Sequence, residues 1–236
     1  MAEAMLEAEG LCAGYGPAEI LFDVSLKLAR GEVAALMGRN GAGKSTTLKA
    51  IMGLIPPRAG RVRFAGRDIA GLPPFRIARL GLGYVPEDRR IFTDLTVTEN
   101  LEVGRRPAEG RDPWTPERLF EVFPNLASMR NRRAAAMSGG EQQMLAIART
   151  LMGNPEAVLL DEPSEGLAPV ILELMADAVL RMKREGIAVL LSEQNFDFAA
   201  AVADRAYVIE RGEIRYDGSM AALEADPALR AQHLSL

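Results

Sequence analysis

A glycine-rich segment that ends in lysine and serine carries the clearest chemistry in the sequence. Residues 38–45, Gly-Arg-Asn-Gly-Ala-Gly-Lys-Ser, match the phosphate-binding pattern G-x-x-x-x-G-K-[ST]. The apolar run 33–37 before it predicts a strand and the run 45–52 after it predicts a helix, which is the context this loop requires. Glycines let backbone N–H groups converge on phosphate oxygens, and the helix N-terminus adds partial positive charge. We predict that Lys44 reaches the β- and γ-phosphates of a nucleotide and that the Ser45 hydroxyl ligates Mg2+.

Two acidic residues close an apolar run in the C-terminal half. Residues 157–160 are apolar, and Asp161 and Glu162 follow them directly. Sheets of the doubly wound class carry their ligand chemistry at the carboxyl ends of strands. We therefore predict that Asp161 holds Mg2+, directly or through water, and that Glu162 polarises an attacking water. Alone, two acids at a strand end indicate only a solvated surface, so this hypothesis depends on the phosphate loop.

A second helix N-terminus with small side chains is predicted at Ser138-Gly139-Gly140. It opens an amphipathic helix whose apolar face comprises Met144, Ile147, Ala148 and Leu151. Such a helix end can contact an anion closely. The spacing of Ser138 and Glu141 also matches a capping box, which it favours on its own, and the two roles are compatible.

The elements that must position these residues follow from the pattern of apolar runs and turns. Strands alternating with crossover helices in the C-terminal part indicate a parallel α/β sheet. The segment from 98 to about 154 has apolar residues at helical spacing, which predicts a mostly helical insert. Strands are predicted at 11–15, 20–28, 33–37, 62–64, 82–85, 157–160, 187–191 and 206–210, with a hairpin at 213–216. Further helices are predicted at 74–80, 169–184 and 196–203.

The composition excludes several functional classes. The 236 residues, of which 48% are apolar and 25% charged, suit one large domain with a real core, or a domain with a small insert. The net charge of -4 gives no general attraction to nucleic acid. With Cys12 and His233 as the single cysteine and histidine, an internal disulfide, a cysteine zinc site and a Ser-His-Asp triad are excluded. The longest apolar run, 198–203, is too short to span a bilayer, and 1–9 lacks the basic residues of an export signal, so we expect a cytoplasmic location.

Taken together, the motifs resemble the ATP-binding subunit of an ABC transporter. The similarity rests on the phosphate loop, the Ser-Gly-Gly-Glu-Gln signature and the Leu-Leu-Asp-Glu-Pro strand in this order, and it covers nearly the whole chain. The segments 84–92, 161–169 and 192–195 resemble the branched-chain amino-acid importer ATPases of the LivF type. The resemblance implies an α/β fold of the P-loop NTPase class: a mixed or parallel sheet core, an N-terminal antiparallel β subdomain and an inserted helical subdomain. It also implies one ABC ATPase domain, 1–236. Residues 1–96 and 155–236 would form its RecA-like core with the β subdomain, and 97–154 the helical insert that carries the signature.

The resemblance also implies roles for individual residues. The nucleotide, ATP, would contact Tyr15, Arg39, Asn40, Gly41, Ala42, Gly43, Lys44, Ser45, Thr46, Ser138, Gly139 and Gly140. Of these, Tyr15 would stack on adenine, and the three signature residues would contact the γ-phosphate of ATP bound to a partner subunit, in a head-to-tail dimer that closes on ATP and opens on hydrolysis. Mg2+ would be held by Ser45, Asp161 and Glu87, which occupies a position usually held by glutamine.

Two positions depart from the commoner ABC pattern. Gln194 stands where most members carry a histidine that contacts the γ-phosphate, and it can donate a hydrogen bond but cannot take a proton. Ala168 stands where the loop after the second strand motif usually ends in aspartate, so polar contacts across a dimer would be fewer. The catalytic residues implied are Glu162, Gln194 and Lys44.

The implied function is an ATPase, bound peripherally at the cytoplasmic face of the inner membrane, that drives import of branched-chain amino acids. Its partners would be a second ABC ATPase, identical or paralogous, integral permease subunits, and indirectly a periplasmic binding protein. A coupling helix of the permease would enter a groove between the helical insert and the sheet, with 87–92 at its floor. Alternatives are import of urea, short amides or another amino acid, a non-transport ABC ATPase, and a slow nucleotide sensor. The cargo is left open because it never touches the ATPase.

Overall fold

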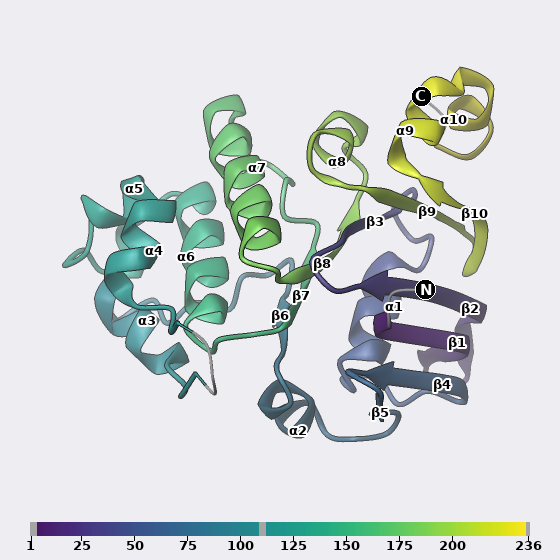
Figure 1. The fold of residues 1–236 in the computed structure, drawn as a ribbon, viewed down its shortest axis with the longest axis horizontal. Coiled ribbons are helices and arrows are strands. Elements are labelled where there is room, and N and C mark those ends of the chain that lie inside the picture. Colours follow the sequence, from purple (N-terminus) through teal and green to yellow (C-terminus); the bar gives the residue numbers. More distant parts are fainter. Residues whose placement is uncertain (1–3, 109–111, 235–236) are drawn as a thin grey trace.

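Two β-sheets and a cluster of helices build the molecule, seen in a computed structural model that describes residues 4–108 and 112–234 (Figure 1). The larger sheet has the order β10-β9-β3-β8-β7-β6, and its pairs are parallel except for the antiparallel pair β9–β10. Its strands are β3 (Val33–Met37), β6 (Leu82–Val85), β7 (Ala157–Asp161), β8 (Ala188–Glu193), β9 (Arg205–Glu210) and β10 (Glu213–Ser219). The predicted α/β class with a mixed sheet core is confirmed.

The smaller sheet is antiparallel and has the order β2-β1-β4-β5. Its strands are β1 (Ala4–Tyr15), β2 (Ala18–Ala29), β4 (Ala59–Phe64) and β5 (Arg67–Asp68). The first strand begins seven residues before the predicted start at residue 11. Glu7 and Glu9 interrupt the apolar pattern that would have predicted a strand here. In the sheet, Glu7 pairs with Lys27 of β2 and Arg63 of β4, so these cross-strand ion pairs accommodate its charge.

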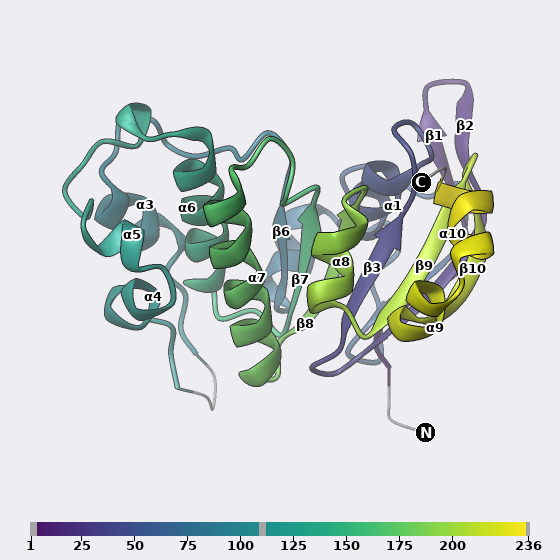
Figure 2. The same ribbon diagram turned by 90° about the horizontal axis from the view of Figure 1, so that it is seen from above.

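Helix α1 (Lys44–Ile51) lies between the two sheets and shares a core with both. Leu48 and Ile51 pack with Leu6 of β1 and Leu190 of β8 in one buried cluster. The opposite face of the larger sheet is covered by α6 (Gly139–Leu151), α7 (Pro169–Arg184) and α8 (Phe196–Val202) (Figure 2). All five residues of β3 are therefore buried, as expected for a strand covered on both faces.

The remaining helices lie around the edges of the two sheets (Figure 1). In Figure 1, α3 (Val97–Gly104), α4 (Pro116–Val122) and α5 (Pro124–Ala127) gather beside α6, at the end away from the small sheet. The helical character predicted for 98–154 is found, but it is broken into short helices because Thr96, Thr115 and Ser138 each cap a new one. The others are α2 (Pro74–Arg79), α9 (Met220–Ala225) and α10 (Pro227–Leu234). Among the helices of residues 4–108 and 112–234, none combines the length and the apolar character of a membrane-spanning segment.

Candidate nucleotide-binding site

The phosphate loop connects β3 to α1 and opens onto a cavity of about 450 Å3. Gly43 is the N-cap of α1 with φ 115°, a conformation that L-residues avoid. A Cβ atom on Gly43 would also lie 2.9 Å from Leu21 Cδ2. Helix α1 has no side-chain cap and no acidic residue in its first turn. Its first N–H groups are consequently available to an external anion, and no acidic residue of its own first turn offsets the helix dipole.

Lys44 lies at the floor of this loop and is almost fully buried. Its Nζ donates to Gly38 O at 2.8 Å and Arg39 O at 3.1 Å, and it lies 3.0 Å from Glu162 Oε1. Both partners of this ion pair are at least nine-tenths buried, at 3% and 8% side-chain exposure. The Lys44 ammonium group can therefore exchange the Glu162 carboxylate for the oxygens of an incoming phosphate without first being exposed to water.

Glu162 is held on three sides. It has a left-handed backbone, φ 47°, and its N–H lies 3.1 Å from Ser192 O and 3.0 Å from Ser192 Oγ. Gln194 Nε2 donates to Glu162 Oε2 at 3.0 Å and to Asn40 Oδ1 of the phosphate loop at 2.7 Å. The carboxylate therefore connects the phosphate loop with the ends of β7 and β8, and Gln194 acts here as a donor, as its chemistry predicts.

Asp161 is held by hydrogen bonds at the end of β7. Its Oδ1 accepts from Ser192 Oγ at 2.8 Å and its Oδ2 accepts from the Tyr84 hydroxyl at 3.1 Å. Burial and then the charge of Asp161 raise the pKa of Tyr84, so the phenol keeps its proton and remains a donor. Ser192 and Tyr84 were not predicted as site residues. The one signal for Ser192 was its position, since it is a polar residue that directly follows the apolar run 187–191.

Acidic groups are concentrated where Mg2+ was predicted. Glu87 lines the phosphate cavity together with Ser45, and it lines an adjoining cavity together with Asp161. Burial, followed by the charges of Glu165, Glu162 and Asp161, raises the pKa of Glu87. A hard cation would relieve this repulsion, and the donors are the oxygen atoms that Mg2+ prefers. Among residues 4–108 and 112–234, no three acidic, cysteine or histidine groups form a complete metal site, and Mg2+ commonly takes one or two protein ligands plus phosphate and water.

Most of the residues predicted to contact nucleotide do share one cavity. Its lining contains Tyr15, Asn40, Gly41, Gly43, Lys44, Ser45, Thr46, Glu87 and Glu162, together with Ile20 and Glu165, which were not predicted. Tyr15 is half exposed at the rim, at 50% relative accessibility, as a stacking platform must be. Arg39 and Ala42 are not among the lining residues, although Arg39 O accepts the Lys44 hydrogen bond.

Ser138, Gly139 and Gly140 are not brought to this cavity within one chain. They begin α6, which packs on the other face of the larger sheet from α1 (Figure 1). Ser138 caps the helix: Glu141 N donates to Ser138 Oγ at 3.4 Å and Ser138 N donates to Glu141 Oε2 at 2.7 Å. The predicted capping box is therefore present. A Cβ atom on Gly139 would lie 2.8 Å from Arg89 Nη1, so the guanidinium group rests on this helix end.

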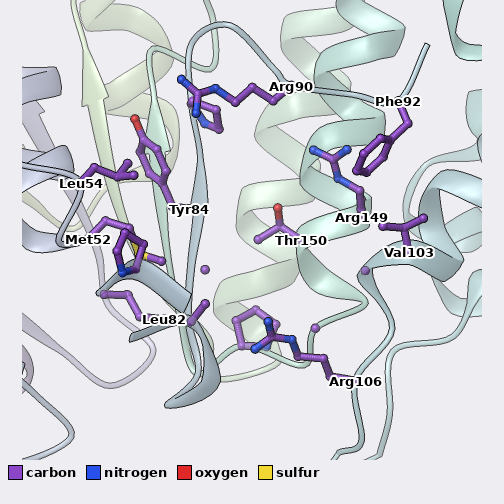
Figure 3. A pocket seen from close by; sticks show the side chains of 17 residues that line it. Met52, Leu54, Leu82, Tyr84, Arg90, Phe92, Val103, Arg106, Arg149 and Thr150 are labelled. Atoms are coloured by element: carbon purple, nitrogen blue, oxygen red, sulfur yellow. The ribbon is translucent and has the colours of Figure 1, made fainter. Parts of the chain in front are cut away.

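A second cavity, of about 400 Å3, lies among α2, β6, α3 and α6 (Figure 3). Its rim contains the exposed apolar side chains of Leu54, Phe92 and Val103. Arginines also line it, namely Arg90, Arg106 and Arg149, and no carboxylate does so among the described residues. The Arg149 guanidinium lies 5.1 Å from the Phe92 ring centre, and its enclosed Nη1 has no hydrogen-bond partner in the described part of the chain.

Comparison with known proteins gives one family. The family model described as "ABC transporter" matches residues 21–165. The high-affinity branched-chain amino acid transport ATP-binding protein BraG of Pseudomonas aeruginosa is 43% identical over 98% of this chain and 99% of its own length. A probable branched-chain amino acid transport ATP-binding protein LivF of Archaeoglobus fulgidus is 36% identical over 91% and 92%. The lipopolysaccharide export system ATP-binding protein LptB of Haemophilus influenzae is 34% identical over 98% and 97%.

Solved structures agree with the sequence relatives. A nucleotide-free ATP-binding cassette from an ABC transporter superposes with a TM-score of 0.82 at 28% identity, covering 96% of this chain and 97% of that one. The phosphate loop, the acidic end of β7 and the capped start of α6 thus occur in the fold and the sequence context of these ATPases. The chain belongs to the ABC transporter family and is one of its ATP-binding, ATP-hydrolysing proteins.

Proposed function

We propose that this protein is the ATP-hydrolysing subunit of an importer for branched-chain amino acids, bound peripherally at the cytoplasmic face of the inner membrane. The observation that supports the cargo is the 43% identity to BraG over nearly the full length of both chains. The 34% identity to LptB, named for lipopolysaccharide export, is lower but covers as much of the chain. The higher identity to BraG favours an amino-acid cargo over a lipid.

The chemistry is proposed to begin when ATP displaces the ion pair of Lys44 and Glu162. The phosphates would take the free N–H groups of α1 and the Lys44 ammonium, while adenine stacks on Tyr15. Mg2+, held by Ser45, Asp161 and Glu87, would neutralise charge on the phosphates. Glu162, released from Lys44, would orient and polarise the attacking water, and the Gln194 amide would keep its carboxylate in place. The interaction that supports these roles is the 3.0 Å contact of Lys44 with Glu162.

A second ATPase subunit is proposed to complete the site. Ser138, Gly139 and Gly140 begin a helix that does not line the nucleotide cavity of the same chain. In a head-to-tail dimer they would contact the γ-phosphate bound to the partner. Closure would then follow from contacts that exist only with ATP present, and hydrolysis would remove them.

The cavity in Figure 3 is proposed to receive a helix of the permease. Its apolar rim suits the apolar face of an amphipathic helix, as in other helix-in-groove contacts. Arg90 already pairs with Asp88, but Arg149 Nη1 has no partner in the described part of the chain, which favours an acidic side chain on that helix. Burial lowers the pKa of Arg149, and a carboxylate beside it would stabilise the charged form.

The catalytic proposal is tested with Glu162→Gln in the purified chain. This variant keeps the shape of Glu162 but cannot polarise water, so we expect ATP hydrolysis to fall at least 100-fold and an ATP-dependent dimer to accumulate. Light scattering with size-exclusion chromatography measures the dimer. Glu173→Gln, on the exposed face of α7, is the matched control and should retain wild-type hydrolysis. A Glu162→Gln chain that stays monomeric with ATP would contradict the proposed dimer mechanism.

The cargo is tested in vesicles that contain the ATPase with its own permease subunits and binding protein. Uptake of leucine, isoleucine and valine is expected to depend on ATP, whereas urea and short amides should not be transported. ATP-dependent uptake of urea alone, or extraction of a lipid, would replace the proposed cargo without affecting the assignment of the ATPase.

A further inference from the structure

Glu193, the last residue of β8, is a buried carboxylate with no role in the proposed reaction. Only 2% of its surface is exposed. Within the described residues no basic side chain pairs with it, and a buried charge without a partner of opposite sign is expensive. Four donors surround it instead: Oε1 accepts from Ser164 N at 3.0 Å, and Oε2 accepts from Ser164 Oγ at 2.8 Å, Gln194 N at 3.1 Å and Asn195 N at 3.2 Å.

These donors come from the two loops that flank Glu162. Ser164 belongs to the loop after β7, two residues beyond Glu162. Gln194 belongs to the loop after β8, and its side chain is the one that donates to Glu162 and Asn40. Asn195 begins α8, where its Oδ1 accepts from Phe198 N at 3.1 Å. One carboxylate therefore ties the loop after β7 to the start of the loop after β8.

We propose that Glu193 is a positioning residue for hydrolysis: by tying Ser164 to the backbone of Gln194, it holds the Gln194 amide on Glu162. This inference rests on the proposed function, in which Glu162 orients water. Gln194 is exposed and has two side-chain hydrogen bonds, so its amide keeps its direction only while its backbone is fixed. Burial raises the pKa of Glu193, and the four donors oppose that rise, which supports a group retained for its hydrogen bonds.

The tie holds the backbone of Gln194, one of the positions at which the chain departs from the common ABC pattern. Gln194 replaces the usual histidine. A glutamine side chain has no charge with which to hold itself against Glu162. A fixed backbone aligns the Gln194 amide with Glu162 instead, because the entropy of ordering this residue is already lost when the chain folds.

The test is Glu193→Gln in the ATPase that hydrolyses ATP, alone or with its permease. The amide NH2 would face N–H donors, so at least one of the four hydrogen bonds is lost. We expect kcat to fall roughly 10- to 100-fold while KM for ATP changes less than about 3-fold. In a Gln194→Ala background the same substitution should change kcat by less than about 3-fold, because Glu193 acts through Gln194. The control is Glu32→Gln. Glu32 directly precedes β3, is partly buried and pairs with Arg205, and its substitution should leave kcat at the wild-type value.

Amide hydrogen exchange provides a readout that does not need turnover. Glu193→Gln should accelerate exchange at Gln194 and Asn195 relative to wild type, and Glu32→Gln should not. If Glu193→Gln does not fold, Ser164→Ala removes one donor and should lower kcat about 2- to 5-fold with the same dependence on Gln194. An unchanged kcat and unchanged exchange, or an equal loss of kcat with and without Gln194, would overturn the inference. If the wild-type protein did not hydrolyse ATP, the proposed function would be overturned instead. Amide hydrogen exchange would still decide whether Glu193 holds the backbone of Gln194.

Discussion

The helices α1 and α6 both begin at glycine-rich segments, but their N-termini are capped in opposite ways. Helix α1 starts after Gly43, with no side-chain cap and no acid in its first turn. Helix α6 starts after Ser138, with both halves of a capping box and with Glu141 in its first turn. The first end keeps its N–H groups for a ligand, whereas the second satisfies part of its own.

The difference indicates which end is built to bind nucleotide alone. At α1, an anion supplies the missing cap and the missing negative charge together, so binding gains from both. At α6, Glu141 already provides negative charge, and a phosphate there would have to share Ser138 with the helix. A weaker, conditional contact suits an end that meets nucleotide only when a partner subunit brings it, as the proposed dimer requires.

The strongest test of this comparison removes the cation at each end. Lys44→Ala takes away the one basic side chain among the described residues that line the phosphate cavity, and it leaves Glu162 buried without its partner. We expect ATP affinity of the isolated chain to fall about 100-fold or more, about 3 kcal/mol, because charge-assisted hydrogen bonds are lost. Arg89→Ala, beside Gly139, should change it less than about 2-fold. Calorimetric titration with ATP measures both, and equal losses would remove the distinction between the two ends.

A subtler test adds one methyl group at each end. In Gly43→Ala the new Cβ would meet Leu21 in a backbone with φ 115°, so the loop must distort, and ATP affinity should fall about 10-fold. In Gly139→Ala the Cβ would meet the terminal nitrogen of Arg89, a flexible side chain that can move. Affinity of the isolated chain should stay within about 2-fold, while the dimer formed by Glu162→Gln with ATP should weaken. Normal dimerisation of the double variant would contradict a role for Gly139 at the partner's nucleotide.

The smallest expected effect is on stability. Ser138→Ala removes the cap of α6 and should lower the free energy of unfolding by about 1 kcal/mol, measured by urea denaturation. The control is Ser128→Ala. The exposed Ser128 hydroxyl, at the end of α5, donates to Asn125 O, and its removal should lower the free energy of unfolding by less than about 0.5 kcal/mol. An equal effect of the two substitutions would show that the capping box of α6 contributes little.

Local features of the molecule were predictable because they depend on near neighbours in the chain. The phosphate loop, the start of α1 and the capping box of α6 follow from spacings of three to seven residues, over which turn and cap hydrogen bonds act. The strand β1 was predicted only in part, since its charged residues are compensated by Lys27 and Arg63 on strands that become neighbours only in the sheet.

Spacing along the chain was enough to predict which residues would bind a triphosphate and which family the chain resembles. The contacts of Glu162 with Lys44 and Gln194 follow from the fold instead, because β3, β8 and β7 are adjacent in the sheet although distant in the chain. The fold likewise buries Glu193 among four donors, although the predicted strand ended at residue 191. Burial and pairing across a parallel sheet depend on the order of its strands, which the pattern of residues along any one strand does not record.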